Sequence, residues 1–235
     1  MKTADVIIVG SGASGLFNAL FLPQDYKVIV ITKKEVEESD SFLAQGGISA
    51  LKNPEDYDSY FEDTMKAGHY ENDKGAVEKM IKESPQIIQD LKDFGVRFDL
   101  KDGEIEFTRE GGHSTFRILH HEDLTGKEIT SHLYEEAKKR DNITIMENCT
   151  MIDIIEKDGE CKGIVYKDAD GNLDTIEAPD TVLATGGLGG LFKHSTNFRH
   201  LTADSLAVCL RHNVELENIN SIQQHFIQRN QEEDS

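Results

Sequence analysis

Residues 5–16 read Asp5-Val6-Ile7-Ile8-Val9-Gly10-Ser11-Gly12-Ala13-Ser14-Gly15-Leu16, and residues 27–31 read Lys27-Val28-Ile29-Val30-Ile31. A β-branched run ends at the first glycine of a Gly-x-Gly-x-x-Gly pattern, and a segment of helical composition joins it to a second β-branched run. Strand, tight turn, helix and strand in this order are typical of a dinucleotide-binding unit. The N–H groups at the start of the helix would face the phosphates. A tight strand–helix turn with no ligand is the alternative interpretation.

The composition argues against several classes of partner. The 235 residues include 25 Lys and Arg against 44 Asp and Glu, a formal net charge of −19. A surface of this charge repels nucleic acid and anionic membranes, so neither is an expected partner. No apolar run approaches the ~20 residues that cross a bilayer. The amino terminus is typical of a strand rather than a signal peptide, and three scattered cysteines fit a reducing compartment, so the sequence predicts a cytoplasmic protein.

The segment after the second strand departs from an ordinary NAD site. Such a site places an acid about 20 residues after the last glycine, on the ribose hydroxyls. Here the strand ends at Thr32-Lys33 and the next carboxylate, Glu35, comes late, although Thr32 can still bind a ribose. Residues 36–50 then combine small and apolar residues with Gly46-Gly47, which favours a ligand-lining loop over a simple linker.

These motifs together resemble a known family. Ile8 to Gly15, then Thr32-Lys33, then Asp40-Ser41-Phe42-Leu43-Ala44-Gln45-Gly46-Gly47 are similar to the flavoprotein family of L-aspartate oxidase, fumarate reductase and the succinate dehydrogenase flavoprotein subunit. The resemblance implies FAD rather than NAD, with the small-residue loop along the flavin. Asp40 stands where the covalently flavinylated members carry histidine, which implies that FAD is bound non-covalently.

Residues 108–122 contain several side chains that can exchange protons or bind charged groups, and glycines lie among them. Glu110 and His113 could exchange protons, and Arg117 could hold a carboxylate bidentately. A metal site using the neighbouring histidines is less favoured, because His120 and His121 are adjacent and point in different directions, so we expect no metal. The segment from Arg109 to Ser114 resembles the L-aspartate oxidase form of the family, which implies that Glu110 meets the substrate's ammonium group. A solvated turn carboxylate is the alternative.

Periodicity outlines the remaining elements. We expect helices across residues 55–100, with an N-cap at Asn72-Asp73 and a stop at Gly95. Further predicted elements are a hairpin over 96–107 turning at 102–103, a helix over 127–140, strands at 143–146, 151–155 and 180–184, and a hairpin joining 163–166 to 174–178. The turn at 168–172 resembles the start of a calcium loop, but Pro179 stands where the bidentate glutamate belongs, so the sequence indicates a hairpin only.

The resemblance extends toward the carboxyl end. It implies that Cys149-Thr150 meet the adenine and that Ala184-Thr185-Gly186 lie beneath the pyrophosphate. The family's Gly-Asp-Gly is Ala203-Asp204-Ser205 here, which places the local backbone in doubt. Gln223-Gln224-His225 match the start of a motif whose histidine contacts substrate. The polar residues that follow predict a disordered tail.

The sequence therefore predicts an α/β protein: a Rossmann-like FAD-binding domain with a central parallel sheet over residues 1–200, a small β insertion between 150 and 180, and the stub of a truncated capping domain over 201–235. Substrate contacts are expected from Glu110 and His225. The FAD contacts are expected from Gly10, Ser11, Gly12, Ala13, Ser14, Gly15, Thr32, Lys33, Asp40, Ser41, Phe42, Leu43, Ala44, Gln45, Gly46, Gly47, Cys149, Thr150, Ala184, Thr185, Gly186 and Asp204.

The implied activity is the FAD-dependent oxidation of L-aspartate to iminoaspartate in NAD biosynthesis, with oxygen or fumarate as electron acceptor. Two alternatives remain: an inactive truncated FAD-binding fragment, and a fumarate reductase-like or succinate dehydrogenase-like flavoprotein. The resemblance reaches only about half of a full-length family member, so weak or absent aspartate oxidation is expected of the chain as given.

Overall fold

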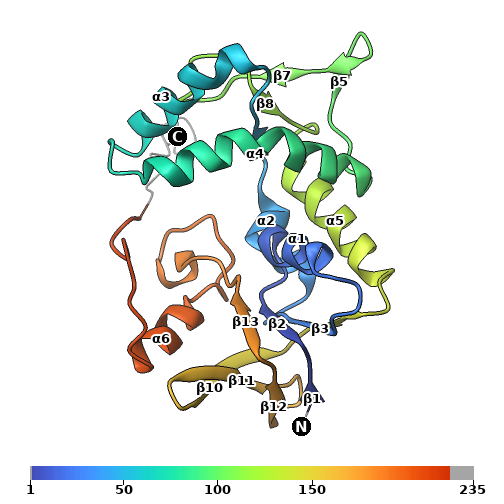
Figure 1. Ribbon diagram of the computed structural model, residues 1–235, viewed down its shortest axis with the longest axis vertical. Helices are drawn as coiled ribbons and strands as arrows, with labels where there is room; N and C mark the ends of the chain where they lie inside the picture. Colours follow the sequence, from blue (N-terminus) through green and yellow to red (C-terminus); the bar gives the residue numbers. More distant parts are fainter. Residues whose placement is uncertain (1, 223–235) are drawn as a thin grey trace, which may run out of the picture.

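A computed structural model describes residues 2–222, and its centre is a four-stranded sheet. The strands β2 (Val6–Val9), β3 (Val28–Ile31), β9 (Ile143–Met146) and β13 (Asp180–Leu183) lie in the order β13-β2-β3-β9. Every neighbouring pair is parallel, with Val6 opposite both Val28 and Asp180. Figure 1 shows this sheet between two outer regions of the molecule. The predicted central parallel sheet is confirmed.

Side chains alternate across the central sheet and build two cores. Val6, Ile8, Val28 and Val30 face α1 (Ala13–Phe21) and pack with Ala19. The helices α1 and α5 (Thr125–Lys138) share a further core, which includes Leu16 and Leu133. The α5 helix begins at Thr125, two residues before the predicted start at residue 127.

The opposite face of the central sheet is covered by a second sheet. Ile7, Val9, Ile29 and Ile31 pack with residues of β10 (Thr150–Lys157), β11 (Glu160–Lys167) and β12 (Leu173–Glu177). This is the predicted β insertion. It gains a strand that the sequence did not indicate, β1 (Lys2–Thr3), which pairs in parallel with β12. The helix α6 (Asp204–Arg211) adds Val208 to the same core.

The other end of the molecule holds α3 (Tyr57–Ala67) and α4 (Lys74–Asp93) together with several short strands (Figure 1). Asp73 caps α4 by accepting a hydrogen bond from the Ala76 amide at 2.7 Å, as predicted. The predicted hairpin over 96–107 is shorter than expected: β5 (Leu100–Lys101) and β6 (Glu104–Ile105) pair at the predicted turn. Phe107 belongs to another sheet, in which β8 (Ile118–Leu119) lies between β4 (Ile48–Ser49) and β7 (Phe107–Thr108).

Short helical turns complete the connections. They are η1 (Val36–Glu38), α2 (Asp40–Leu43), η2 (Pro54–Asp56) and η3 (Gly189–Leu191). The stretch predicted as a ligand-lining loop is therefore partly helical. Within residues 2–222, no helix has the length and apolar character to cross a membrane.

Candidate functional site

The larger cavity, of about 570 Å³, lies at the carboxyl ends of the central strands. Open parallel sheets bind ligands at this edge. Its walls come from segments that follow β2, β3 and β13 and from the start of β10. Of the predicted FAD residues, those lining it are Gly10, Ser11, Gly12, Ser14, Thr32, Lys33, Asp40, Ser41, Cys149, Thr150, Ala184, Thr185, Gly186 and Asp204.

Two glycines allow the backbone to form the floor of this cavity. Gly10 has φ +114°, and a Cβ there would lie 2.1 Å from the Ala184 carbonyl oxygen, so a side chain at this position would strain the turn. A Cβ on Gly12 would lie 2.9 Å from the Ser41 hydroxyl, a group that can rotate away. Gly12 precedes the first turn of α1 and carries no side chain, so a ligand can approach the amide groups of that turn.

Hydroxyl groups in the same cavity have hydrogen-bonding capacity to spare. Ser11 is 3% exposed, and its Oγ and that of Ser39 are buried without a hydrogen-bond partner among the described residues. Buried polar atoms of this kind normally bind protein, water or ligand. The Ser41 Oγ accepts a hydrogen bond from the Ala13 amide at 3.0 Å. Free hydroxyls beside a helix amino terminus fit the pyrophosphate of a dinucleotide.

One wall of the cavity is a strap, which we define as residues 197–205. Lys33 Nζ contacts the strap at three points: the His200 carbonyl oxygen at 2.8 Å, Thr202 Oγ1 at 2.9 Å and Asp204 Oδ2 at 2.7 Å. The Asp40 carboxylate accepts hydrogen bonds from the Phe198 amide at 3.1 Å and from the Asn197 side chain. The Thr185 and Ser205 hydroxyls are bonded to each other. Three predicted FAD residues therefore also hold this wall in place.

The backbone that the sequence left in doubt is left-handed at Ala203, with φ 56° and ψ 39°. This is the first position of the family's Gly-Asp-Gly motif. Glycine adopts this conformation freely, whereas alanine is strained in it. The strap thus keeps a backbone suited to glycine although the side chain has changed.

A second cavity, of about 500 Å³, has a different chemistry. Four of its lining residues carry carboxylates and one is a histidine; the lining residues are Gln45, Gly46, Gly47, Asp99, Thr108, Glu110, His120, Glu122 and Asp123. Glu110 Oε1 accepts a hydrogen bond from the Gly47 amide at 3.1 Å. Glu110, the predicted substrate residue, therefore contacts residues 45–47, the part of the predicted flavin loop that we call the strip. The surrounding carboxylates favour a cation.

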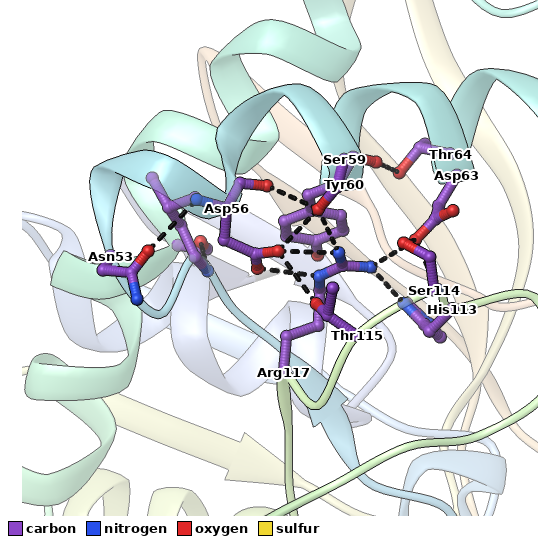
Figure 2. A network of polar contacts seen from close by, with 12 residues as sticks. Asn53, Asp56, Ser59, Tyr60, Asp63, Thr64, His113, Ser114, Thr115 and Arg117 are labelled. Carbon is purple, nitrogen blue, oxygen red and sulfur yellow. Dashed lines mark hydrogen bonds and ion pairs between the residues drawn. The ribbon is translucent and has the colours of Figure 1, made fainter.

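Arg117 lines neither cavity, and its guanidinium points toward Asp56, Tyr60 and Asp63 (Figure 2). Its side chain is fully buried, and Nε and Nη2 contact the two carboxylate oxygens of Asp56 at 2.9 and 2.8 Å. Nη1 contacts Asp63 Oδ2 at 2.6 Å. Hydrogen bonding from Arg117 lowers the pKa of Asp56 from its usual 3.8 to about 2. The sequence predicted that Arg117 binds a carboxylate bidentately, and it does, but the carboxylate is the protein's own.

Two histidines near the second cavity lie beside acidic side chains. His120 Nδ1 lies 3.1 Å from Asp99 Oδ2, and His132 Nε2 lies 3.1 Å from Glu128 Oε1. Across residues 2–222 no group of three or more His, Cys, Asp or Glu side chains is arranged to hold a metal ion.

The predicted FAD residues divide between the two cavities. Fourteen of them line the larger cavity, as given above, and Gln45, Gly46 and Gly47 line the acidic one. Five predicted residues line neither cavity: Ala13 and Gly15 lie in α1, Phe42 and Leu43 in α2, and Ala44 directly after it. His225 lies outside the described residues.

Sequence reasoning missed several residues of the larger cavity. Glu38, Ser39 and the strap residues His200 to Thr202 all line it. Glu38, three residues after the Glu35 that the sequence analysis considered, is the carboxylate of this segment that lines the cavity. It could have been found only by knowing that the η1 turn folds the chain back toward the cavity.

Comparison with known proteins identifies the family of this chain. A family model described as an FAD binding domain matches residues 5–230. The chain belongs to the FAD binding domain family. Two relatives of this FAD binding domain, named L-aspartate oxidase, are those of Clostridium perfringens, 44% identical over 95% of the chain, and Clostridium acetobutylicum, 46% identical over 94%. The chain spans about half the length of these curated relatives, 51% in each case.

Solved structures agree with the family assignment. The E. coli quinol fumarate reductase matches with a TM-score of 0.86 and 28% identity, over 90% of this chain and 38% of that one. The Sdh1 complex of Mycobacterium smegmatis matches with a TM-score of 0.82 and 31% identity, over 90% and 39%. The predicted resemblance, the α/β FAD-binding fold and FAD as cofactor are confirmed.

Proposed function

We propose that the chain is the FAD-binding part of an L-aspartate oxidase. Its relatives of that name are 44% and 46% identical to it. The observation that carries the proposal is Glu110, whose carboxylate lies on the Gly46–Gly47 strip within a carboxylate-rich cavity. A carboxylate at this point suits a substrate with an ammonium group.

In this proposal the larger cavity holds FAD non-covalently. The first turn of α1 and the Ser11 hydroxyl bind the pyrophosphate, and Thr32 and Lys33 bind the adenosine ribose side. Cys149-Thr150 lie by the adenine, and the strip from Gln45 to Gly47 lies by the flavin. Asp40 cannot form the histidyl bond of covalent relatives, and its carboxylate is already engaged by the strap.

Glu110 would orient the substrate through its ammonium group. Opposite charges within a few ångströms attract strongly where water is displaced, so Glu110 favours an amino acid over a plain dicarboxylate. The flavin, when bound, supplies the capacity to accept two electrons from the substrate. We also propose oxygen or fumarate as the final acceptor.

The fumarate reductase-like alternative is less favoured. The lining of the acidic cavity includes the carboxylates of Asp99, Glu110, Glu122 and Asp123. These would repel a ligand that carries only carboxylates.

A cytoplasmic location is proposed from the three cysteines, Cys149, Cys161 and Cys209, which are all free thiols.

Two glycine-to-alanine variants, one inside and one outside the larger cavity, test the FAD site. Gly12→Ala should fold, because the only atom within 3 Å of its new methyl group is Ser41 Oγ, a side-chain atom that can shift, yet the methyl group blocks the approach of the pyrophosphate. We expect FAD affinity, measured by quenching of flavin fluorescence, to fall about tenfold or more, or ~1.4 kcal/mol. Gly187→Ala is the matched control, since no atom lies within 4 Å of its Cβ position.

The proposal fails if the two variants bind FAD equally well. Acid precipitation of the loaded chain separates the modes of attachment: the flavin should appear in the supernatant. Flavin that stays with the precipitated protein would contradict non-covalent binding.

A further inference from the structure

Arg117 makes more contacts than a single ion pair requires. Besides Asp56 and Asp63, its guanidinium donates to Ser59 Oγ at 2.7 Å and lies 4.8 Å from the centre of the Tyr60 ring. All of these partners belong to α3 or to the η2 turn immediately before it (Figure 2). Arg117 itself lies on the segment that leads from Glu110 to β8.

The residues just before Arg117 are tied to the same helix. Asp63 Oδ2 accepts hydrogen bonds from both the amide and the hydroxyl of Ser114, each at 2.7 Å. Thr115 Oγ1 donates to Asp56 Oδ1 at 2.8 Å. Although burial alone would raise it, these hydrogen bonds from Ser114 and Arg117 hold the pKa of Asp63 below its usual value. Both aspartates, Asp56 at the end of η2 and Asp63 on α3, are therefore ionised anchors at neutral pH.

His113 connects this anchored segment to the Glu110 turn. Arg117 Nη1 lies 3.1 Å from His113 Nδ1, and the His113 amide donates to the Glu110 carbonyl oxygen at 3.3 Å. A guanidinium can only donate, so Nδ1 must accept and the ring proton sits on Nε2. The Arg117 contact thus fixes both the orientation and the tautomer of His113.

The turn between Glu110 and His113 has little else to hold it. Gly111 and Gly112 lie between them, Gly112 has φ +87°, and no atom lies within 4 Å of either Cβ position. Glycine pairs without neighbours have the largest conformational freedom. Glu110 is then positioned from two sides, by the Gly47 amide and by the end of the turn that His113 fixes.

We infer that Arg117 is a positioning residue for Glu110. It holds His113 to the Asp56–Asp63 anchor on α3, and His113 in turn holds the glycine turn that presents the Glu110 carboxylate to the acidic cavity. This inference rests on the proposed function for the part that concerns substrate. Arginine is required because its fork serves Asp56, Asp63 and His113 together, which a lysine ammonium cannot do.

Hydrogen exchange on the FAD-loaded chain tests the positioning itself. In Arg117→Lys the loss of hydrogen bonds to charged groups should speed amide exchange about tenfold or more at residues 110–114 and at Gly47, with α1 unchanged. Arg140→Lys is the matched control, because Arg140 follows the end of α5 and, among residues 2–222, its side chain forms an ion pair with Glu136 alone, at 3.6 Å. If Arg117→Lys does not fold, Asp63→Asn serves instead, since it keeps the Arg117–Asp56 pair.

The inference is overturned if exchange at 110–114 and Gly47 is unchanged, or if it rises equally in α1 and α5, which would indicate only a general loss of stability. A second measurement uses the flavin absorbance to follow binding of L-aspartate and of succinate, which lacks the ammonium group. Arg117→Lys should lower the affinity for L-aspartate about tenfold or more and the affinity for succinate less than about threefold. Equal weakening of the two ligands would overturn the inference.

A chain that binds FAD but responds to neither ligand would contradict the proposed substrate, and the exchange result would still decide whether Arg117 positions Glu110.

Discussion

The two cavities share the segment from Ser39 to Gly47 but differ in what they can bind. The larger one presents glycines, free hydroxyls and the first turn of a helix, with its lysine, Lys33, already paired to the strap. The smaller one presents four carboxylates and His120. Backbone amides suit a phosphate, whereas a group of carboxylates repels phosphate and attracts an ammonium ion.

This difference explains how one short segment can serve two ligands. Ser39 to Ser41 point into the larger cavity, and the backbone then turns through α2 so that Gln45 to Gly47 line the acidic one. The two cavities are also supported differently. The larger one is walled by the strap, and in our inference Glu110 of the acidic one is positioned by the ion pairs of the buried Arg117 with Asp56 and Asp63. Three predictions test this contrast.

The largest effect should come from acid, through Asp56. Its pKa is about 2 in the folded chain against a usual 3.8, so its ionisation stabilises the fold above about pH 4, and this stability is lost as pH falls toward 2. The shift corresponds to about 2 kcal/mol. Urea unfolding across this pH range should show the loss in the natural chain and a smaller one in Asp56→Asn.

Asp58→Asn is the control for the acid experiment, because Asp58 is an exposed acid only two residues away, in the first turn of α3. Its pH dependence should match that of the natural chain. If Asp56→Asn also matches, the Arg117 anchor does not support the acidic cavity in the way we describe.

A middle-sized effect is expected from Glu110→Gln, which removes one charge from the acidic cavity and leaves the larger cavity intact. The preference for L-aspartate over succinate, followed by flavin absorbance, should fall about tenfold because a charged partner of the ammonium is lost. FAD affinity should not change. Glu104→Gln, on the exposed strand β6, controls for overall charge. An equal loss of FAD affinity would break the contrast between the cavities.

The smallest effect should come from the strap, at Ala203→Gly. The left-handed backbone there costs an alanine roughly 1 kcal/mol, so glycine should stabilise the chain by about 0.5–1 kcal/mol in urea unfolding. Ala207→Gly, within α6, should instead destabilise it by about 1 kcal/mol. Destabilisation by both substitutions would show that the left-handed turn is not under strain.

Local patterns predicted much of this structure. The β2–α1–β3 unit, the Asp73 cap and the β11–β12 hairpin follow from neighbouring residues, so the sequence indicated them directly. Fourteen of the predicted FAD residues surround the larger cavity because they follow the carboxyl ends of predicted parallel strands or belong to motifs that the resemblance covers.

What the sequence missed depends on distant contacts. The sequence predicted helices around Asp56 and Asp63, and nothing nearby shows that Arg117, more than 50 positions away, binds both carboxylates. The two-residue strand β1 is too short to be recognised without its partner β12. Phe42 and Leu43 were expected to line the flavin, but the turn of α2 carries them out of both cavities.

The order of the central sheet has a consequence for synthesis on the ribosome. The β2 strand lies between β3, which is made about two dozen residues later, and β13, which begins only at Asp180. One edge of β2 therefore stays uncovered while the intervening polypeptide is translated. Strand edges of this kind invite pairing with other chains, so the nascent protein has a long interval in which it depends on dilution or on chaperones.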